Sequence, residues 1–184
     1  MTSGLLLVGG SSTRFGTPKA LARFQDETLA ERAWRTLGEA CDERLAFGKA
    51  DELELPFPIN DDETDTRAPV AGLVAGLRAA MHELCVVLPV DCPLVTAALL
   101  RELADACHDV DVAVPQTGPL PGAYRRTALP VLQRRLAAER LSLRDALGEL
   151  ATRTVDLDER LLVNVNTPDD LLEAEREAAR SAGE

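Results

Sequence analysis

Residues 9 to 19, GGSSTRFGTPK, combine flexible backbone with hydroxyl and cationic side chains. Gly9 and Gly10 allow the backbone to approach a ligand closely and to aim several N–H groups into one concavity. Arg14 and Lys19 add positive charge, and the compact ammonium of a lysine suits a phosphate group. The spacing matches neither GxGxxG nor GxxxxGK[ST]. The combination favours a phosphate-binding loop over the alternative, a glycine turn with two solvated cations.

A single carboxylate, Asp91, follows the apolar run of residues 84–88 and is flanked by Pro89 and Pro93. Magnesium often takes one or two protein carboxylates and draws its other ligands from phosphates and water. The position therefore suits a Mg²⁺ ligand. A turn aspartate that bonds its own backbone is the alternative, and it explains the residues equally well. Cys92, the next residue, is expected to be incidental.

Two amides, Asn164 and Asn166, lie two residues apart in the segment VNVNTPDDL. If this segment is extended, both side chains point to the same face. They could then orient a metal-bound water or a polar substrate. The alternative is that Asn166 only shapes the turn from a strand into the following helix.

The chain has 31 acidic and 20 basic residues, a formal net charge of −11 and a pI of about 4.7. Such an acidic molecule repels nucleic acid and anionic membranes, so we expect neither as a partner. A phosphate ligand must be held by local donors and a metal. Lysine occurs only at Lys19 and Lys49, and we expect Lys19, but not Lys49, to contact such a ligand.

The four cysteines form no CxxC pair and have no histidine at zinc-site spacing, which indicates reduced and mostly buried thiols. The chain contains no stretch of eighteen apolar residues, and its first residues do not resemble a signal peptide. We therefore expect a cytoplasmic protein.

Apolar runs bounded by turn residues alternate with segments of helical periodicity. Expected strands cover residues 3–8, 44–47, 57–60, 84–88, 110–114, 152–156 and 162–165. Expected helices cover residues 28–40, 69–81, 95–107, 129–139 and 143–150, with Ser142 capping the fifth, and a last helix begins at Pro168 after its cap, Thr167. The segment PLPGAYRR is expected to be a loop or an edge strand, because Pro119 and Pro121 cannot donate to a ladder.

This alternation predicts an α/β fold with a mostly parallel sheet that is covered on both faces. The length of 184 residues suits one domain over residues 1–184. Ligands of such folds bind beyond the carboxyl ends of the strands. The site is therefore expected in loops 9–19, 61–68, 89–93 and 164–167.

The segments GGSSTRFGTPKAL, APVAGL, VLPVDCPLV and VNVNTPDDL, in this order and spacing, resemble the molybdenum cofactor guanylyltransferases. The resemblance spans residues 5 to about 172. It implies a three-layer Rossmann-like nucleotidyltransferase fold and transfer of GMP from GTP to molybdopterin, with release of pyrophosphate. It also implies Mg²⁺ as cofactor and possible contacts with other proteins of molybdenum cofactor biosynthesis.

The resemblance further implies which residues of this chain act. Lys19, Asp91 and Arg14 would be catalytic, and Asp91 would hold the metal. The residues expected to bind nucleotide or pterin are Leu7, Val8, Gly9, Gly10, Lys19, Asp61, Asp91, Asn164 and Asn166.

Two departures from the family pattern affect the base. Ala68 replaces a glycine of the usual GPLAG, and Phe47 lies near the position of an asparagine that helps to bind guanine. If Phe47 packs into the core, backbone groups near Gly9 must read the base; if it lines the pocket, it could stack on any base. Transfer of another nucleotide, transfer to another acceptor, and nucleotide binding without catalysis remain alternatives. An NAD-dependent dehydrogenase is disfavoured because the glycine fingerprint is missing.

Overall fold

A computed structural model describes residues 1–9, 18–49 and 54–181 of the chain. Its centre is a six-stranded sheet in the order β4-β1-β5-β7-β6-β8. The strands are β1 (Ser3–Leu7), β4 (Glu43–Phe47), β5 (Leu84–Pro89), β6 (Val112–Pro115), β7 (Gly122–Arg125) and β8 (Thr152–Val155). β7 is antiparallel to both of its neighbours, and the other pairs are parallel. The mostly parallel sheet is thus confirmed.

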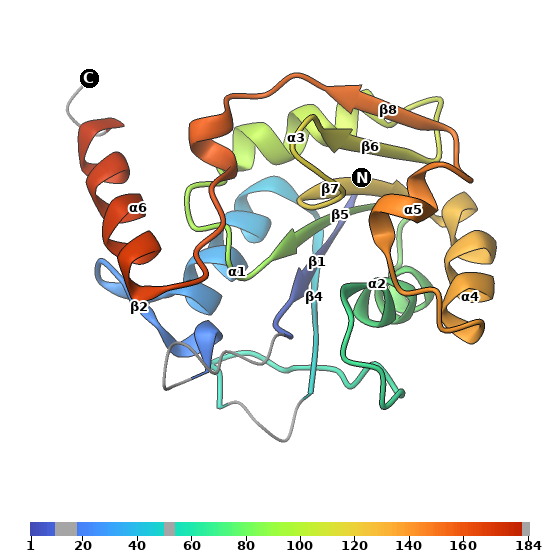
Figure 1. Cartoon of the computed structure of the whole chain (residues 1–184), viewed down its shortest axis with the longest axis horizontal. Coiled ribbons are helices and arrows are strands. Elements are labelled where there is room, and N and C mark those ends of the chain that lie inside the picture. The colour runs from blue at the N-terminus through green and yellow to red at the C-terminus, as the bar shows by residue number, and fades with distance from the viewer. Residues whose placement is uncertain (10–17, 50–53, 182–184) are drawn as a thin grey trace.

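Helices cover both faces of this sheet and make a three-layer α/β fold (Figure 1). One face carries α1, α3 and α6, and the other carries α2, α4 and α5. Their bounds are α1 (Leu29–Ala40), α2 (Pro69–Ala79), α3 (Ala97–Ala106), α4 (Leu129–Ala137), α5 (Leu143–Leu147) and α6 (Pro168–Ser181). None of the helices in the described part of the chain is long and apolar enough to cross a membrane.

Strand β1 explains why the sheet needs two covering layers. Its five residues are all buried, and successive side chains of a strand point to opposite faces. Leu6 packs into the core beneath α1 and α3, whereas Leu5 and Leu7 pack into the core beneath α2 and α4. Each fully buried leucine contributes about 1.5–3 kcal/mol. A helix layer on only one face would leave half of this contribution unmade.

Side-chain caps fix where the helices begin. Thr28 forms a capping box with Glu31 at α1, and the Ser142 hydroxyl accepts from the amide of Asp145 at α5. At α6 the Thr167 hydroxyl accepts from the Asp170 amide at 3.2 Å. The sequence-based caps at Ser142 and Thr167 are therefore confirmed.

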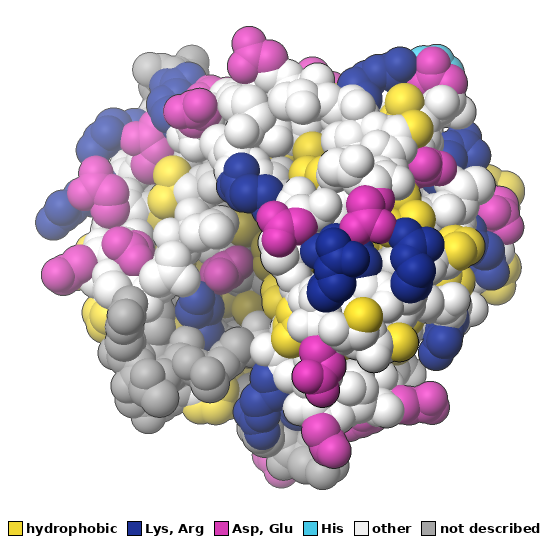
Figure 2. Space-filling view, turned by 45° about the vertical axis from the view of Figure 1, so that its right-hand side comes forward, with side chains coloured by type: hydrophobic (Ala, Val, Ile, Leu, Met, Phe, Trp, Pro, Cys, Tyr) yellow, Lys and Arg dark blue, Asp and Glu magenta, His cyan; other side chains and the backbone are white. Residues whose placement is uncertain are grey.

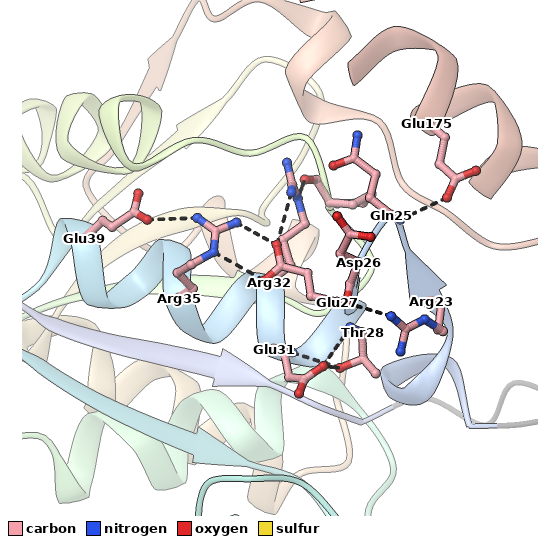
Figure 3. A network of polar contacts seen from close by, with 11 residues as sticks. Arg23, Gln25, Asp26, Glu27, Thr28, Glu31, Arg32, Arg35, Glu39 and Glu175 are labelled. Carbon is pink, nitrogen blue, oxygen red and sulfur yellow. Dashed lines mark hydrogen bonds and ion pairs between the residues drawn. The ribbon is translucent and has the colours of Figure 1, made fainter. Parts of the chain in front are cut away.

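A short hairpin precedes α1 and is tied to it by ion pairs. Its strands are β2 (Arg23–Phe24) and β3 (Glu27–Thr28), which pair antiparallel. The carboxylate of Glu27 accepts from both Arg32 and Arg35 of α1 (Figure 3). The sequence pattern does not indicate this hairpin, because two-residue strands carry no measurable periodicity.

The structure corrects three expected strands. β7 lies between β5 and β6 rather than at an edge; Pro119 and Pro121 precede its first ladder residue, so neither disturbs the ladder. Residues 57–60 contribute only the bridge from Asn60 to Phe47. Residues 162–165 end a short 3-10 helix, η4 (Glu159–Leu162), and continue without a strand. The thiols of Cys85, Cys92 and Cys107 are buried and all four cysteines are free, as expected.

Candidate active site

A cavity of about 430 Å³ lies at the carboxyl ends of three adjacent parallel strands, β4, β1 and β5. Its floor is formed by Leu7, Val8 and Gly9, which end β1. Backbone hydrogen bonds lock the three ends together, from Val8 N to the Phe47 oxygen at 3.0 Å and from Val90 N to the Leu7 oxygen at 3.1 Å. The floor is therefore built from main chain held on both sides.

Close packing of α2 against the sheet brings a helix start to one wall of this cavity. A Cβ at Gly72 would lie 3.0 Å from Leu7 Cδ2, so a larger residue there would push α2 away from β1. Pro69 occupies the first turn of α2 and lines the cavity together with Ala68. The small residues of the segment APVAGL thus set the distance between helix and floor.

At the β5 side of the cavity, Lys19 and Asp91 form an ion pair. Lys19 belongs to a short 3-10 turn, η1 (Lys19–Leu21), and Asp91 follows β5. The Lys19 Nζ lies 3.3 Å from Asp91 Oδ2 and 2.9 Å from Asn166 Oδ1. Three segments that are far apart in sequence therefore converge on one ammonium group.

Asn164 enters the same cavity and is held by the residue next to Asp91. The Cys92 thiol donates to Asn164 Oδ1 with the sulfur 2.9 Å from the oxygen. A backbone bond from Val165 N to the Asp91 oxygen, 2.8 Å long, joins the two loops. Oδ1 is thus occupied by the thiol, whereas the amide nitrogen of Asn164 donates to no protein group among the described residues. Burial and the neighbouring carboxylate raise the pKa of Cys92 well above its usual value, so it stays a thiol and a donor.

The start of α6 holds Asn166 in place. Asp170 Oδ2 accepts from the backbone amides of Asn166 and Thr167, both at 2.8 Å. The bond from the Asn166 amide is the first cause that lowers the pKa of the Asp170 carboxyl below its ordinary value. The cap of α6 and the position of the Asn166 side chain are therefore coupled.

The ion-pair network that joins the β2–β3 hairpin to α1 also reaches this site. Arg32 donates from Nε to the carbonyl oxygen of Pro93, at 2.5 Å, and from Nη1 to Glu27. Pro93 lies two residues after Asp91, so α1 supports the loop that carries this carboxylate. The remainder of the network is shown in Figure 3.

Most of the site residues that the sequence predicted, among those that the structure describes, lie at this one cavity. Leu7, Val8, Gly9, Lys19, Asp91 and Asn164 line the cavity, and Asn166 contacts Lys19. Gly10 and Arg14 lie outside the described residues.

Asp61 is the exception. Its side chain is 51% exposed and accepts from the Glu63 amide at 2.7 Å, away from the cavity lining. Asp62, whose side chain is 8% exposed, lines the cavity instead. Asp62 rather than Asp61 therefore faces the cavity, because the turn of the loop points consecutive residues in different directions.

Lys49 was expected to lie outside the site, and it lines the cavity at the β4 side. Its ammonium is paired with Asp62 and also donates to the Thr64 carbonyl oxygen. Both lysines of the chain therefore border one cavity. Because the chain has only two lysines, their rarity in the sequence could have indicated a place at the site for Lys49 as well as for Lys19.

Two positions were considered for Phe47, in the core or at the pocket, and the residue contacts both. It is only 4% exposed and packs beneath α2, and it also lines the cavity next to Gly48. With 4% of its surface exposed, the residue offers the cavity little contact area. Hydrogen-bonding recognition at this side falls to other groups.

The acidic side chains of the site limit how a metal could be bound. In residues 1–9, 18–49 and 54–181 no group of three or more histidine, cysteine or acidic side chains could surround an ion. Asp91 is placed to give one carboxylate beside a cavity. That donor set fits Mg²⁺ bound together with a triphosphate and water, and does not fit a metal held by protein alone.

Comparison with known proteins gives consistent matches over nearly the whole chain. The model of the MobA-like NTP transferase domain matches residues 4–155. A protein of Chloroflexus aggregans named probable molybdenum cofactor guanylyltransferase is 33% identical, over 93% of this chain and 92% of the relative. Molybdenum cofactor guanylyltransferase of Desulfosudis oleivorans is 30% identical, over 98% and 96%.

Solved structures share the fold. Molybdopterin-guanine dinucleotide biosynthesis protein A of Archaeoglobus fulgidus superposes with a TM-score of 0.82 at 21% identity, covering 97% of this chain and 99% of that one. The 2-C-methyl-D-erythritol 4-phosphate cytidylyltransferase of Thermus thermophilus gives a TM-score of 0.74 at 18% identity, covering 95% and 98%.

Proposed function

The chain belongs to the MobA-like NTP transferase family, and on that premise we propose that it transfers GMP from GTP to molybdopterin and releases pyrophosphate. The observation that carries the proposal is the ion pair of Lys19 with Asp91 at the cavity formed by β4, β1 and β5. One cation for the phosphates and one carboxylate for a metal lie together there. This is the minimum that phosphoryl transfer asks of a protein.

In this reaction the terminal phosphate oxygen of molybdopterin attacks the α-phosphorus of GTP. A new oxygen–phosphorus bond forms while the bond to the β-phosphate oxygen breaks, and that oxygen leaves as pyrophosphate. No protein nucleophile is needed, so the residues act by positioning the reactants and neutralising charge. Lys19 would leave Asp91 and donate to phosphate oxygens. Each charge-assisted hydrogen bond of this kind contributes about 1.5–3 kcal/mol.

Asp91 would hold Mg²⁺ together with the triphosphate. When bound, the ion neutralises phosphate charge, which the acidic molecule as a whole opposes. In the free protein the Lys19 ammonium lies 3.3 Å from Asp91 Oδ2, so the carboxylate that would hold the ion is paired with Lys19. The ammonium is thereby held within reach of an incoming phosphate.

Asn164 and Asn166 support a place for the acceptor beside the phosphates. Both have Oδ1 occupied, by the Cys92 thiol and by Lys19. In the described part of the chain neither amide nitrogen donates to a protein group, so two donors remain for a polar ligand. Molybdopterin carries a phosphate and a pterin that can accept from them.

The test is pyrophosphate release measured with GTP, ATP, CTP and UTP, each with and without molybdopterin and Mg²⁺. Release is expected with GTP alone among the four, and only when molybdopterin and Mg²⁺ are both present. Release with CTP instead would make the chain a cytidylyltransferase. Nucleotide binding without release under any of these conditions would contradict an enzymatic role.

A further inference from the structure

The β4 side of the cavity contains an ion pair that the transfer reaction does not use. Lys49 follows β4, and its ammonium contacts Asp62 Oδ1 and the Thr64 carbonyl oxygen. Asp61 is more distant, with its Oδ1 at 4.0 Å. The Lys49 side chain is 22% exposed and lines the cavity, as does Asp62. The pair is therefore neither a fully solvated surface contact nor fully enclosed.

The position of this pair relative to Lys19 suggests which part of a nucleotide it faces. Neighbouring strands lie about 4.8 Å apart, so the ends of β4 and β5, which flank β1, are separated by about 10 Å. Lys19 and Asp91 mark the phosphate end at β5. A nucleotide laid across the floor of Leu7 to Gly9 places its base at β4, next to Lys49 and Asp62.

Counting donors and acceptors shows what the pair still offers. An ammonium has three N–H donors, and two of those of Lys49 are used by Asp62 and Thr64. The carboxylate of Asp62 accepts through Oδ1 from Lys49 and from the Thr64 amide at 3.4 Å. Among the described residues no group donates to Oδ2. Within the part of the chain that the structure describes, one N–H donor of Lys49 and Oδ2 of its partner Asp62 therefore have no hydrogen-bond partner.

We propose that Lys49, held by Asp62, determines the choice of guanine. The ammonium donates to O6, and Asp62 Oδ2 accepts from N1–H or the N2 amine on the same edge of the ring. Adenine presents a donor at position 6 and an acceptor at N1, so both protein groups would meet a group of their own kind. Leaving a desolvated polar group unpaired costs about 1–3 kcal/mol.

With Lys49 and Asp62 at the base, the chain can read guanine although Phe47 lies near the position of the family's asparagine. The ring of Phe47 is packed beneath α2, and the residue two places later supplies the polar contact. The hydrogen bond to Asp62 raises the pKa of Lys49, so its charge persists at neutral pH. The inference rests on the proposed function, because it takes GTP as the substrate.

The experiment compares the two lysines of the chain. Equilibrium competition binding is measured with GTP, ATP and pyrophosphate for the full chain and for Lys49→Met and Lys19→Met. Lys49→Met is expected to weaken GTP at least tenfold, about 1.4 kcal/mol, while ATP and pyrophosphate change less than about threefold. Lys19→Met is expected to weaken GTP and ATP by the same factor, leaving their ratio unchanged.

Lys49→Arg is the second variant, because a guanidinium retains donors and charge. It is expected to keep most of the preference for GTP over ATP. The inference is overturned if Lys49→Met leaves the GTP-to-ATP ratio as in the wild type. It is also overturned if Lys49→Met weakens pyrophosphate as much as GTP, since Lys49 would then only support the loop.

The wild-type measurement separates this inference from the proposed function. A wild-type chain that binds CTP or ATP more tightly than GTP contradicts the guanylyltransferase assignment itself. A wild-type chain that prefers GTP, with a ratio unaffected by Lys49→Met, contradicts only the role of Lys49.

Discussion

The two oxygens of Asp91 have partners of different kinds. Oδ2 is paired with the Lys19 ammonium, and Oδ1 lies 3.7 Å from the Cys92 thiol. The charged partner belongs to the function that we propose, whereas the thiol belongs to the packing of the loop. A change of the carboxylate to an amide therefore affects charge much more than shape.

Asp91→Asn is expected to lower pyrophosphate release by about two orders of magnitude, because the proposed Mg²⁺ site loses its carboxylate. The melting temperature is expected to stay close to that of the wild type. Asp105→Asn, at an exposed position of α3, is the matched control. Activity near the wild-type value in Asp91→Asn would remove this residue from the metal site.

Cys92→Ala is expected to raise the KM for molybdopterin several-fold with little change in the KM for GTP, because the amide of Asn164 loses the donor that orients it. Cys92→Ser retains a donor and is expected to lie closer to the wild type. Cys107→Ala is the control, because that thiol is also buried but bonds the Ala123 oxygen, outside the cavity lining. Equal effects in Cys92→Ala and Cys107→Ala would assign both to packing alone.

The sequence predicted the residues whose position follows from a strand end. Asp91 lies at the cavity because it follows β5, whose carboxyl end shares one edge of the sheet with those of β1 and β4. Lys19 of η1 and Asn164 after η4 reach the same cavity from segments outside the sheet. The sequence did not predict that Asp62, and not Asp61, lines the cavity, because a loop has no period that fixes which of two neighbouring side chains faces inward. It also missed Cys92 and Lys49, whose contacts depend on segments that approach only in the fold.

Among the elements, the capped helix starts contribute to the stability of the fold, and one of them also adjoins the cavity. Thr28 caps α1 and Thr167 caps α6 through the same kind of bond, both 3.2 Å long. Only the α6 cap adjoins a residue that contacts Lys19. The two threonines therefore form a natural pair for comparison.

Thr28→Ala and Thr167→Ala are each expected to lower the free energy of unfolding by about 1 kcal/mol, measured by urea titration. Thr167→Ala is expected, in addition, to weaken triphosphate binding, because Asn166 loses part of its support. Thr28→Ala serves as its control for stability. Identical nucleotide affinities in the two variants would contradict the coupling between the α6 cap and the site.

Long periodic elements were predicted within a few residues, whereas β7 was misplaced. The helices and β1, β4, β5, β6 and β8 repeat an apolar pattern that their buried faces require. Pro119 and Pro121 indicated an edge, but the rule against proline applies to ladder positions, and the ladder begins at Gly122. Whether a strand inserts between two others depends on pairing that no local pattern encodes.

On the scale of the whole molecule, a large negative charge coexists with many local ion pairs. Acidic and basic side chains are interspersed on the face drawn in Figure 2. Among the charged residues that the structure describes, Arg135 of α4 is the most buried, with 2% exposed. Its Nη1 lies 2.6 Å from Glu149 Oε1, and Arg134 binds the other oxygen at 2.7 Å.

Hydrogen bonds from Arg134 and then Arg135 lower the pKa of Glu149. The contribution of the Glu149 carboxylate to the free energy of unfolding is therefore complete above the ordinary glutamate pKa of about 4.3. This contribution is lost as the pH falls through the lower pKa that Glu149 has in the folded protein. Glu149→Gln is expected to reduce the free energy of unfolding at pH 7, and the difference from the wild type is expected to shrink below about pH 4.

Denaturant titrations at several pH values check this expectation. Glu102→Gln, exposed on α3 and without an ion pair among the described residues, is the control. A constant difference between Glu149→Gln and the wild type across the acid range would contradict the linkage.

The antiparallel strand β7 divides the sheet into two parallel parts, β4-β1-β5 and β6-β8. Among the described residues that line the cavity, only Leu120 and Asn164 come from beyond the Asp91 loop. Under the proposed function, the nucleotide site is thus encoded in the first half of the gene, and the proposed acceptor contact Asn164 is encoded in the second. Recombination within the connection between α3 and β6 would replace the segment that carries Asn164 and retain the cavity residues from Leu7 to Asp91. The incoming segment would have to keep the two contacts that cross this boundary, from Cys92 to Asn164 and from Lys19 to Asn166.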